Sequence, residues 1–230
     1  MTEAQFWDRL AAKYAAQPVK DVAAFERKKA ITRQHLRAAS TVVEFGCGTG
    51  SLALDMSSHA GEIHAIDVSA EMIRIAERKK ADQGATNVTF HTGTLEAVRP
   101  RIPSDVDAVW AYSILHLVAD RTSMLRTAFE LLKPGGVFIS SNVCLAETWV
   151  PYGAIISVMR WLGKAPRVYR YDRKTIEREI AAAGFVDIVE HDVGGHAMVA
   201  FVVATKPGAV ATMQDVADNI GDAELRTPLK

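Results

Sequence analysis

A run of glycines, Gly46, Gly48 and Gly50, follows a short apolar stretch at residues 41–45 and precedes a segment with helical character. Glycine tolerates positive φ angles and lets a ligand approach the backbone closely. The first turn of a helix adds N–H groups that have no partner within the helix. Glu44 stands two residues before the first of these glycines, and a carboxylate there suits an ammonium group better than a pyrophosphate. The loop therefore predicts a binding turn for a ligand that carries an amino group.

The spacing of these glycines disfavours two common nucleotide-binding loops. A dinucleotide-binding loop requires Gly-x-Gly-x-x-Gly, and Ser51 occupies the position of its third glycine. A P-loop requires a Gly-Lys pair, which this loop lacks. Asp67 ends a second strand-like run, and an acid at that place in a doubly wound sheet accepts hydrogen bonds from ribose hydroxyls. Together these residues point to a nucleoside ligand and away from a dinucleotide.

Strand-like and helix-like segments alternate around these residues. Helices are expected at residues 3–16, 21–39, 51–58, 69–83, 120–132 and 172–183. Ser69 is expected to cap the helix at residues 69–83 and Gly84 to end it, and the Lys-Pro-Gly-Gly segment at residues 133–136 is expected to close the helix at residues 120–132. Strands are expected at residues 41–45, 62–67, 87–91, 106–112, 137–142, 185–192 and 197–205. This alternation predicts parallel strands with right-handed crossovers, and Gly194-Gly195 predicts a terminal hairpin. We therefore expect an α/β fold with a doubly wound, seven-stranded, mostly parallel sheet whose last strand is antiparallel.

The chain divides into three expected parts. Residues 1–40 form an N-terminal helical cap, residues 41–206 form the α/β domain, and residues 207–230 form a polar extension. The alternation breaks at residues 145–171, which indicates a small inserted cap with one helix at about residues 152–162.

Composition and charge bear on the class of protein. Of the 230 residues 49% are hydrophobic, and 27 basic side chains balance 27 acidic ones. A nucleic-acid-binding protein normally carries a basic surplus, so no nucleic-acid partner is expected. The N-terminus lacks the basic flank and apolar run of a signal peptide, and Cys47 and Cys144 form neither a disulfide framework nor a metal cluster. We expect a cytoplasmic protein, without a metal, that acts as a monomer or homodimer.

Four segments in this order resemble the class I S-adenosylmethionine-dependent methyltransferases, in the small-molecule branch that includes ubiquinone and menaquinone enzymes. They are residues 42–50, 65–72, 107–110 and 131–136. The resemblance covers residues 5–145 and, more loosely, residues 172–206. It implies a Rossmann-like fold, methyl transfer as the activity, and S-adenosylmethionine as the cofactor with S-adenosylhomocysteine as product.

The resemblance also implies roles for individual residues of the loop. The three glycines at positions 46, 48 and 50, with Cys47 inside the turn, would pass under the methionine portion of the cofactor. Glu44 would orient its amino group, and Asp67 would hold the ribose.

Further cofactor contacts are implied by the same resemblance. Val68 and Met72 would pack on or near the adenine. Ala111 and Tyr112, after the fourth strand, would line the methionine and transfer region. Tyr14 matches a tyrosine that often reaches the methionine carboxylate.

One segment departs from the family pattern. The family commonly has an acidic residue in a Gly-Asp-Ala type of turn before the backbone that contacts adenine, whereas this chain has Gly93-Thr94-Leu95. Thr94 could still hydrogen-bond the adenine amino group through its hydroxyl, so Thr94 and Leu95 stay among the expected cofactor residues. The departure does not affect the predicted fold.

His116 is the candidate general base. Methyl transfer is an in-line displacement at a carbon on a cationic sulfonium, so the protein mainly supplies orientation and electrostatics. A base is needed only where the acceptor must lose a proton early. His116 follows the fourth strand, at the carboxyl edge where open α/β sheets bind ligands. The alternative is that His116 packs against the following helix as a structural residue.

Two segments bear on the methyl acceptor. Methyltransferases that act on exocyclic amines of DNA bases carry Asn-Pro-Pro-Tyr or a close relative where this chain has residues 111–114, Ala-Tyr-Ser-Ile. The insertion contains an apolar and aromatic run at residues 149–162, followed by basic residues. A lid of this kind beside Arg167, Tyr169 and Arg170 predicts a small hydrophobic acceptor, with or without an anionic group. A helix that covers the sheet and contact with an anionic membrane surface are the alternatives.

Other functions compete with methyl transfer to a small organic acceptor. A nicotinamide-dependent dehydrogenase is disfavoured by the missing third glycine and by Glu44. A non-catalytic S-adenosylmethionine-binding sensor or partner subunit would carry the same cofactor motif. An open acceptor pocket beside the methyl group is the feature that separates this class from an enzyme.

Overall fold

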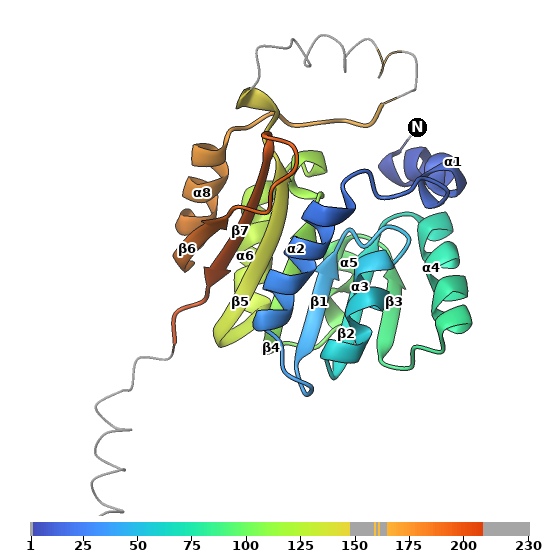
Figure 1. The fold of residues 1–230 in the computed structure, drawn as a ribbon, viewed down its shortest axis with the longest axis horizontal. Helices are drawn as coiled ribbons and strands as arrows, with labels where there is room; N and C mark the ends of the chain where they lie inside the picture. Colours follow the sequence, from blue (N-terminus) through green and yellow to red (C-terminus); the bar gives the residue numbers. More distant parts are fainter. Residues whose placement is uncertain (1, 148–158, 160, 162–164, 209–230) are drawn as a thin grey trace, which may run out of the picture.

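The computed structural model describes residues 2–147, 159, 161 and 165–208. A seven-stranded sheet with strand order β3-β2-β1-β4-β5-β7-β6 forms its centre (Figure 1). The first five strands run parallel, and β7 runs antiparallel to both β5 and β6. The predicted doubly wound sheet with an antiparallel last strand is confirmed. The strands are β1 (Thr41–Phe45), β2 (Glu62–Asp67), β3 (Val88–Thr92), β4 (Val106–Tyr112), β5 (Leu132–Val143), β6 (Val186–His191) and β7 (Val199–Thr205).

Helices surround this sheet (Figure 1). They are α1 (Glu3–Ala15), α2 (Val22–Gln34), α3 (Ser51–Met56), α4 (Ala70–Gln83), α5 (Leu95–Val98), α6 (Arg121–Leu131) and α8 (Arg173–Ala182). Short 3₁₀ helices are η1 (Ser57–His59), η2 (Arg99–Arg101), η3 (Leu115–Leu117) and η4 (Leu145–Glu147). Among the described residues, no helix combines the length and apolarity needed to span a bilayer. The helix expected at residues 152–162 lies almost wholly outside the described residues, as do residues 209–230.

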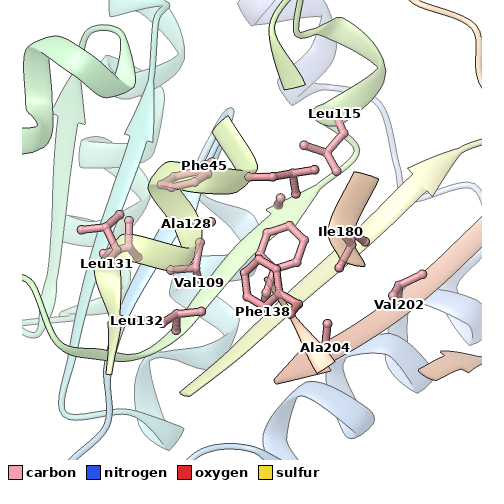
Figure 2. Close-up of a cluster of buried hydrophobic side chains, with 14 of the residues drawn as sticks. Phe45, Val109, Leu115, Ala128, Leu131, Leu132, Phe138, Ile180, Val202 and Ala204 are labelled. Atoms are coloured by element: carbon pink, nitrogen blue, oxygen red, sulfur yellow. The ribbon is translucent and has the colours of Figure 1, made fainter. Parts of the chain in front are cut away.

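The side chains of β1 and β4 explain why both faces of the sheet are covered. Val43 and Val109 lie in one buried cluster with side chains of α5, α6 and α8 (Figure 2). Val42 and Trp110 lie in a second buried cluster, with side chains of α2, α3 and α4. Successive side chains of a strand point to opposite faces, so a parallel strand that is buried on both faces, as β1 is, needs helices on both sides.

Local caps set the helix boundaries. Ser69 Oγ accepts a hydrogen bond from the backbone N–H of Met72 at 3.1 Å, and Gly84 ends α4 in the left-handed conformation, as predicted. The prediction for α2 is wrong at its end, because the helix stops at Gln34 and not at residue 39. There the chain turns into β1, and Ser40 Oγ accepts a hydrogen bond from the backbone N–H of Arg37 at 2.9 Å.

The Lys-Pro-Gly-Gly segment was predicted to close the helix before β5. This prediction is wrong, because the segment lies within β5. β5 begins at Leu132, which pairs with Val106, and the next pair is Ala108 with Val137. The residues between them form an irregularity in the register. Gly135, at a φ of 76°, donates its N–H to the carbonyl of Lys206 at 2.9 Å, so the irregular segment stays bonded to the chain after β7.

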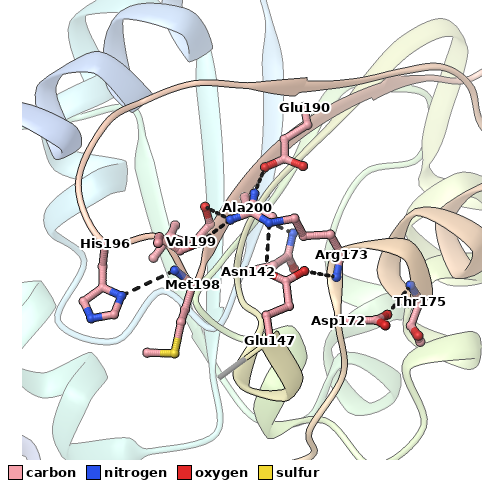
Figure 3. A network of polar contacts seen from close by, with 11 residues as sticks. Asn142, Glu147, Asp172, Arg173, Thr175, Glu190, His196, Met198, Val199 and Ala200 are labelled. Atoms are coloured by element: carbon pink, nitrogen blue, oxygen red, sulfur yellow. Dashed lines mark hydrogen bonds and ion pairs between the residues drawn. The ribbon is translucent and has the colours of Figure 1, made fainter. Parts of the chain in front are cut away.

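Arg173 fixes the positions of the chain on either side of the insertion (Figure 3). Its backbone N–H and its Nε donate to the carboxylate of Glu147, at 2.8 and 2.9 Å. Its guanidinium also contacts the carboxylate of Glu190 and the carbonyl of Ala197. The start and the return of the insertion are therefore joined to each other and to the β6–β7 pair.

Candidate functional site

A pocket of about 310 Å³ opens at the carboxyl ends of β1, β4 and β5. Its walls come from α1, the connection at residues 17–19, α2, the glycine loop, α3, α4 and the ends of β4 and β5. The chain leaves β1 and β4 toward opposite sides of the sheet, and ligands of open α/β folds bind at such a point. The volume lies at the lower end of the range for small-molecule sites.

Glu44 places a buried carboxylate in this pocket. The side chain is only 2% exposed, and its Oε2 has no hydrogen-bond partner among the described residues. Burial raises its pKa to about 8, the negative charge of Asp67 adds to the rise, and a backbone hydrogen bond from Ala53 opposes it. A buried carboxylate without a partner is costly, and a cation beside it would remove that cost. The orphaned oxygen therefore fits the ammonium group of an amino acid.

Asp67 ties the glycine loop to the end of β2. Its two carboxylate oxygens accept hydrogen bonds from the backbone N–H groups of Gly48 and Ser69, each at 2.9 Å. Burial raises its pKa, and these two backbone bonds act against the rise. An ionised carboxylate offers about four acceptor positions, so two remain for the hydroxyls of a ribose.

The three glycines have positive φ angles of 67°, 55° and 73°, but their surroundings differ. A Cβ at Gly46 would lie 2.6 Å from the side chain of Ile114, and one at Gly50 would lie 2.5 Å from the ring of Phe90. A Cβ at Gly48 would meet only the ring of Tyr14, at 3.7 Å. Gly46 and Gly50 are thus required by packing, whereas Gly48 keeps the backbone open beneath Tyr14.

We expect Gly50→Ala to lower the free energy of unfolding by about 3 kcal/mol, from overpacking against Phe90 and from the left-handed backbone. Gly84→Ala is the matched control, because Gly84 also has a positive φ, of 66°, but no atom lies within 4 Å of its added Cβ. Gly84→Ala should lower the free energy of unfolding by about 1 kcal/mol, because only the left-handed backbone conformation opposes the added Cβ. Urea denaturation of both variants measures the difference, and equal losses would contradict the packing argument.

Several predicted cofactor residues are brought together in the pocket. Cys47 and Tyr112 line it together with Glu44 and Gly46, and Ala111 is buried directly before Tyr112. Tyr14 lines the opposite wall. Burial around the Tyr14 hydroxyl and the negative charges of Asp67 and Glu44 raise its pKa.

The residues assigned to adenine lie apart from this pocket. Met72 is buried between α4 and α1, in a cluster with Ala11 and Ile75. Leu95 belongs to the core, and the Thr94 hydroxyl accepts a hydrogen bond from the N–H of Ala97 at 3.4 Å as the cap of α5. Neither these residues nor Val68 are among the residues that line the pocket.

His116 also lies outside the lining of the pocket. It stands in η3, where its Nδ1 is buried and has no partner among the described residues. Burial lowers its pKa to about 4. Its carbonyl accepts a hydrogen bond from the N–H of Tyr169 at 2.8 Å, so the segment that contains Arg167 and Arg170 runs beside His116 and does not line the pocket.

Two lysines in the pocket were missed by the sequence analysis. Lys79 Nζ donates to Thr49 Oγ1 at 2.8 Å and to Ser51 Oγ at 3.1 Å, and Lys28 Nζ donates to Ser141 Oγ at 2.9 Å. Burial lowers the pKa of both lysines. A signal for Lys28 was present in the sequence, because it lies four residues from both Ala24 and Thr32, which are buried, and so shares their helix face.

This arrangement defines a class of protein. A doubly wound sheet holds a glycine loop, a buried carboxylate with one unpartnered oxygen, and a second carboxylate at the end of β2. Glu44 and Gly46 line the pocket at the switch point, whereas Gly48, Gly50 and Asp67 are not among its lining residues. The described residues hold no group of three or more His, Cys, Asp or Glu side chains that could bind a metal ion. The unpartnered oxygen of Glu44 fits an ammonium group, and the remaining acceptor positions of Asp67 fit hydroxyl groups.

Comparison with known families agrees with this class. The family described as "Methyltransferase domain" matches residues 36–178, which is more than half of the chain. The chain belongs to this family, within the class I S-adenosylmethionine-dependent methyltransferases.

Individual proteins show the same relationship. The chain is 30% identical over 148 residues to a ubiquinone biosynthesis O-methyltransferase of Serratia proteamaculans, a match that covers 64% of this chain and 60% of that protein. The chain thus spans less than two thirds of that relative. The structure of a putative O-methyltransferase from Nostoc punctiforme aligns with a TM-score of 0.65 and 20% identity, over 87% of this chain and 60% of the other. The (4+2)-cyclase SpnF aligns with a TM-score of 0.64 and 19% identity, over 84% and 85%. The last two likenesses concern the fold alone.

Proposed function

We propose that this protein transfers a methyl group from S-adenosylmethionine to a small organic acceptor. The observation that carries the proposal is the buried Glu44 side chain, which lines the pocket beside the glycine loop and has one carboxylate oxygen without a partner among the described residues. Family membership and the O-methyltransferase relatives support the same activity. The names of those relatives favour an oxygen as the methylated atom.

Each residue of the loop has a distinct task in this proposal. Glu44 pairs with the ammonium group, Asp67 accepts hydrogen bonds from the ribose, and the bare backbone at Gly48 allows close approach under Tyr14. Val68, Met72, Thr94 and Leu95 are proposed to lie near the adenine. When bound, S-adenosylmethionine supplies an electrophilic methyl carbon. Holding the acceptor in line with that carbon contributes ~7–11 kcal/mol to lowering the barrier.

Proton transfer by His116 is not needed for this proposal. A base with a pKa of about 4 is a weak proton acceptor near neutral pH, and His116 does not line the pocket. We expect His116→Ala to keep its turnover rate within about threefold of wild type and to lower stability by about 1–3 kcal/mol through lost packing. Steady-state kinetics across pH measure this. Turnover slowed by roughly two orders of magnitude, with a shifted pH profile, would establish His116 as the base.

Calorimetric titration with S-adenosylhomocysteine, followed by turnover on a panel of acceptors, tests the proposed function. The panel should contain catechols, phenols, amines and thiols, with methylation detected by mass spectrometry. Absence of S-adenosylhomocysteine binding would refute the proposal. Binding without turnover on any acceptor would favour the alternative, a non-catalytic S-adenosylmethionine-binding protein. SpnF, named as a cyclase, shows that a fold of this type does not by itself establish methyl transfer.

A further inference from the structure

Lys28 and Ser141 place a cation and a hydroxyl at one end of the pocket. Lys28 reaches from α2 to Ser141 on β5, where Nζ donates to Oγ at 2.9 Å. Ser141 is 2% exposed, and both residues line the pocket. Among the described residues Lys28 has no ion-pair partner, although the negative charge of Asp21 acts on its ammonium group and opposes the lowering of its pKa by burial. A half-buried ammonium group with a single neutral partner is suited to receive an anion from outside the protein.

The strand order separates this pair from the proposed cofactor site. Glu44 lies on β1 and the glycine loop follows that strand, whereas Ser141 lies on β5, with β4 between β1 and β5. Neighbouring strands are about 4.7–4.9 Å apart, so the two ends of the pocket are separated by about 10 Å. Lys79 lies on the side of the loop, bonded to Thr49 and Ser51. Of the two lysines in the pocket, Lys28 therefore lies farther from the proposed cofactor site, at the β5 end of the pocket, where an acceptor could bind.

A chain of hydroxyl groups holds the backbone of α2 in place at Lys28, and the hydrogen bond to Ser141 orients the Lys28 side chain. The Thr32 hydroxyl donates to the carbonyl of Lys28 at 2.9 Å, and Tyr112 Oη lies 2.6 Å from Thr32 Oγ1. Thr32 is completely buried, so α2 is fixed against the end of β4 at the turn that carries Lys28. A binding group that is fixed before the ligand arrives loses little freedom when the ligand binds.

We propose that Lys28 and Ser141 form a subsite that binds an anionic oxygen of the methyl acceptor, either a carboxylate or a phenolate. This inference rests on the proposed function and adds the chemical class of the acceptor. Lys28 Nζ has three donors, of which one is used, and a hydroxyl that accepts a bond keeps its own hydrogen to donate. Phe25, Val19 and Leu52 in the same pocket offer apolar contacts for the rest of the molecule.

The test measures binding of three probes to the protein saturated with S-adenosylhomocysteine. Benzoate and ionised 4-nitrophenolate carry the two kinds of anionic oxygen, and benzyl alcohol is the neutral comparison. We expect Lys28→Met to weaken the binding of at least one anion by roughly 10- to 100-fold, as for a lost charged hydrogen bond. Benzyl alcohol should bind both proteins alike, and the anion that is affected identifies the acceptor group.

Two further variants make the outcome decisive. Lys28→Arg keeps the charge and should retain most of the anion binding, while Lys174→Met removes an exposed lysine of α8 and should change nothing. The affinity for S-adenosylhomocysteine should be the same in Lys28→Met and wild type. The inference would be overturned if wild type bound neither anion, or if Lys28→Met bound both anions as tightly as wild type does. It would also be overturned if Lys28→Met weakened the binding of S-adenosylhomocysteine and not that of the anions. Wild-type protein that does not bind S-adenosylhomocysteine would instead refute the proposed function.

Discussion

Replacing Glu44 with glutamine is expected to weaken S-adenosylhomocysteine binding by roughly 100-fold or more, because it removes the partner of the ammonium group in a buried site. The same change should make the free protein more stable near pH 8. The two effects have one cause. Glu44 is 2% exposed and its Oε2 has no partner among the described residues, so the carboxylate is unfavourable until a cation arrives.

The sign of the stability effect follows from the pKa of Glu44, which folding raises from 4.5 to about 8. Between these two values the folded protein holds a proton that the unfolded chain has lost. The contribution of Glu44 to stability is therefore greatest below pH 4.5 and falls as pH rises to about 8, by ~1.4 kcal/mol per pH unit, or about 5 kcal/mol in all. Glutamine does not titrate, so Glu44→Gln should remove this slope.

Urea denaturation of wild type and Glu44→Gln at several pH values measures the difference between their slopes. Glu177→Gln removes an exposed carboxylate of α8 and serves as the control. Cofactor binding supplies a second measurement, because a protonated Glu44 must lose its proton to pair with an ammonium group. At pH 7 wild type should release about one proton when it binds S-adenosylhomocysteine, and Glu44→Gln should release none. Parallel pH slopes for the two proteins would contradict the role of Glu44.

The sequence was a sound guide wherever a local pattern determines the structure. Ser69 and Gly84 delimit α4 as predicted, and the apolar run of β1 requires helices on both of its faces. The ends of α2 and β5 were misjudged, because both depend on distant pairings. α2 stops where the chain must enter β1, and the start of β5 is held by pairing with β4 and by Lys206 after β7. A pattern within one segment carries no information about such partners.

The same difference between local patterns and distant contacts applies to the candidate site. Glu44 and the glycines were found because they are neighbours in a short loop with its own spacing. The sequence did not distinguish the three glycines, because Ile114 and Phe90, which constrain Gly46 and Gly50, lie far away in the sequence. Lys28 was missed for a related reason, since its partner Ser141 is 113 residues distant. What a residue faces across the pocket is a property of the fold.

Asp67→Asn is expected to weaken S-adenosylhomocysteine binding by roughly 100-fold or more, through two losses that act together. Both carboxylate oxygens of Asp67 accept backbone N–H groups, from Gly48 and Ser69. An asparagine offers one oxygen and one NH₂ group, so one backbone N–H would face a donor, at a cost of about 1–3 kcal/mol. The loop would lose its anchor at Gly48, and the ribose would lose a charged acceptor.

Asp107→Asn is the matched control, because Asp107 makes the same kinds of contact at the other end of the sheet. Its carboxylate accepts a hydrogen bond from the N–H of Thr41 at 2.8 Å and pairs with Lys133. Thr41 is the first residue of β1, whereas the pocket follows the last. Asp107→Asn should therefore lower the free energy of unfolding by about 1–3 kcal/mol and leave S-adenosylhomocysteine affinity unchanged. If calorimetry shows that both variants lose the same affinity for S-adenosylhomocysteine, the effect of Asp67→Asn comes from general destabilisation. If only Asp67→Asn loses affinity, the ribose lies at the end of β2.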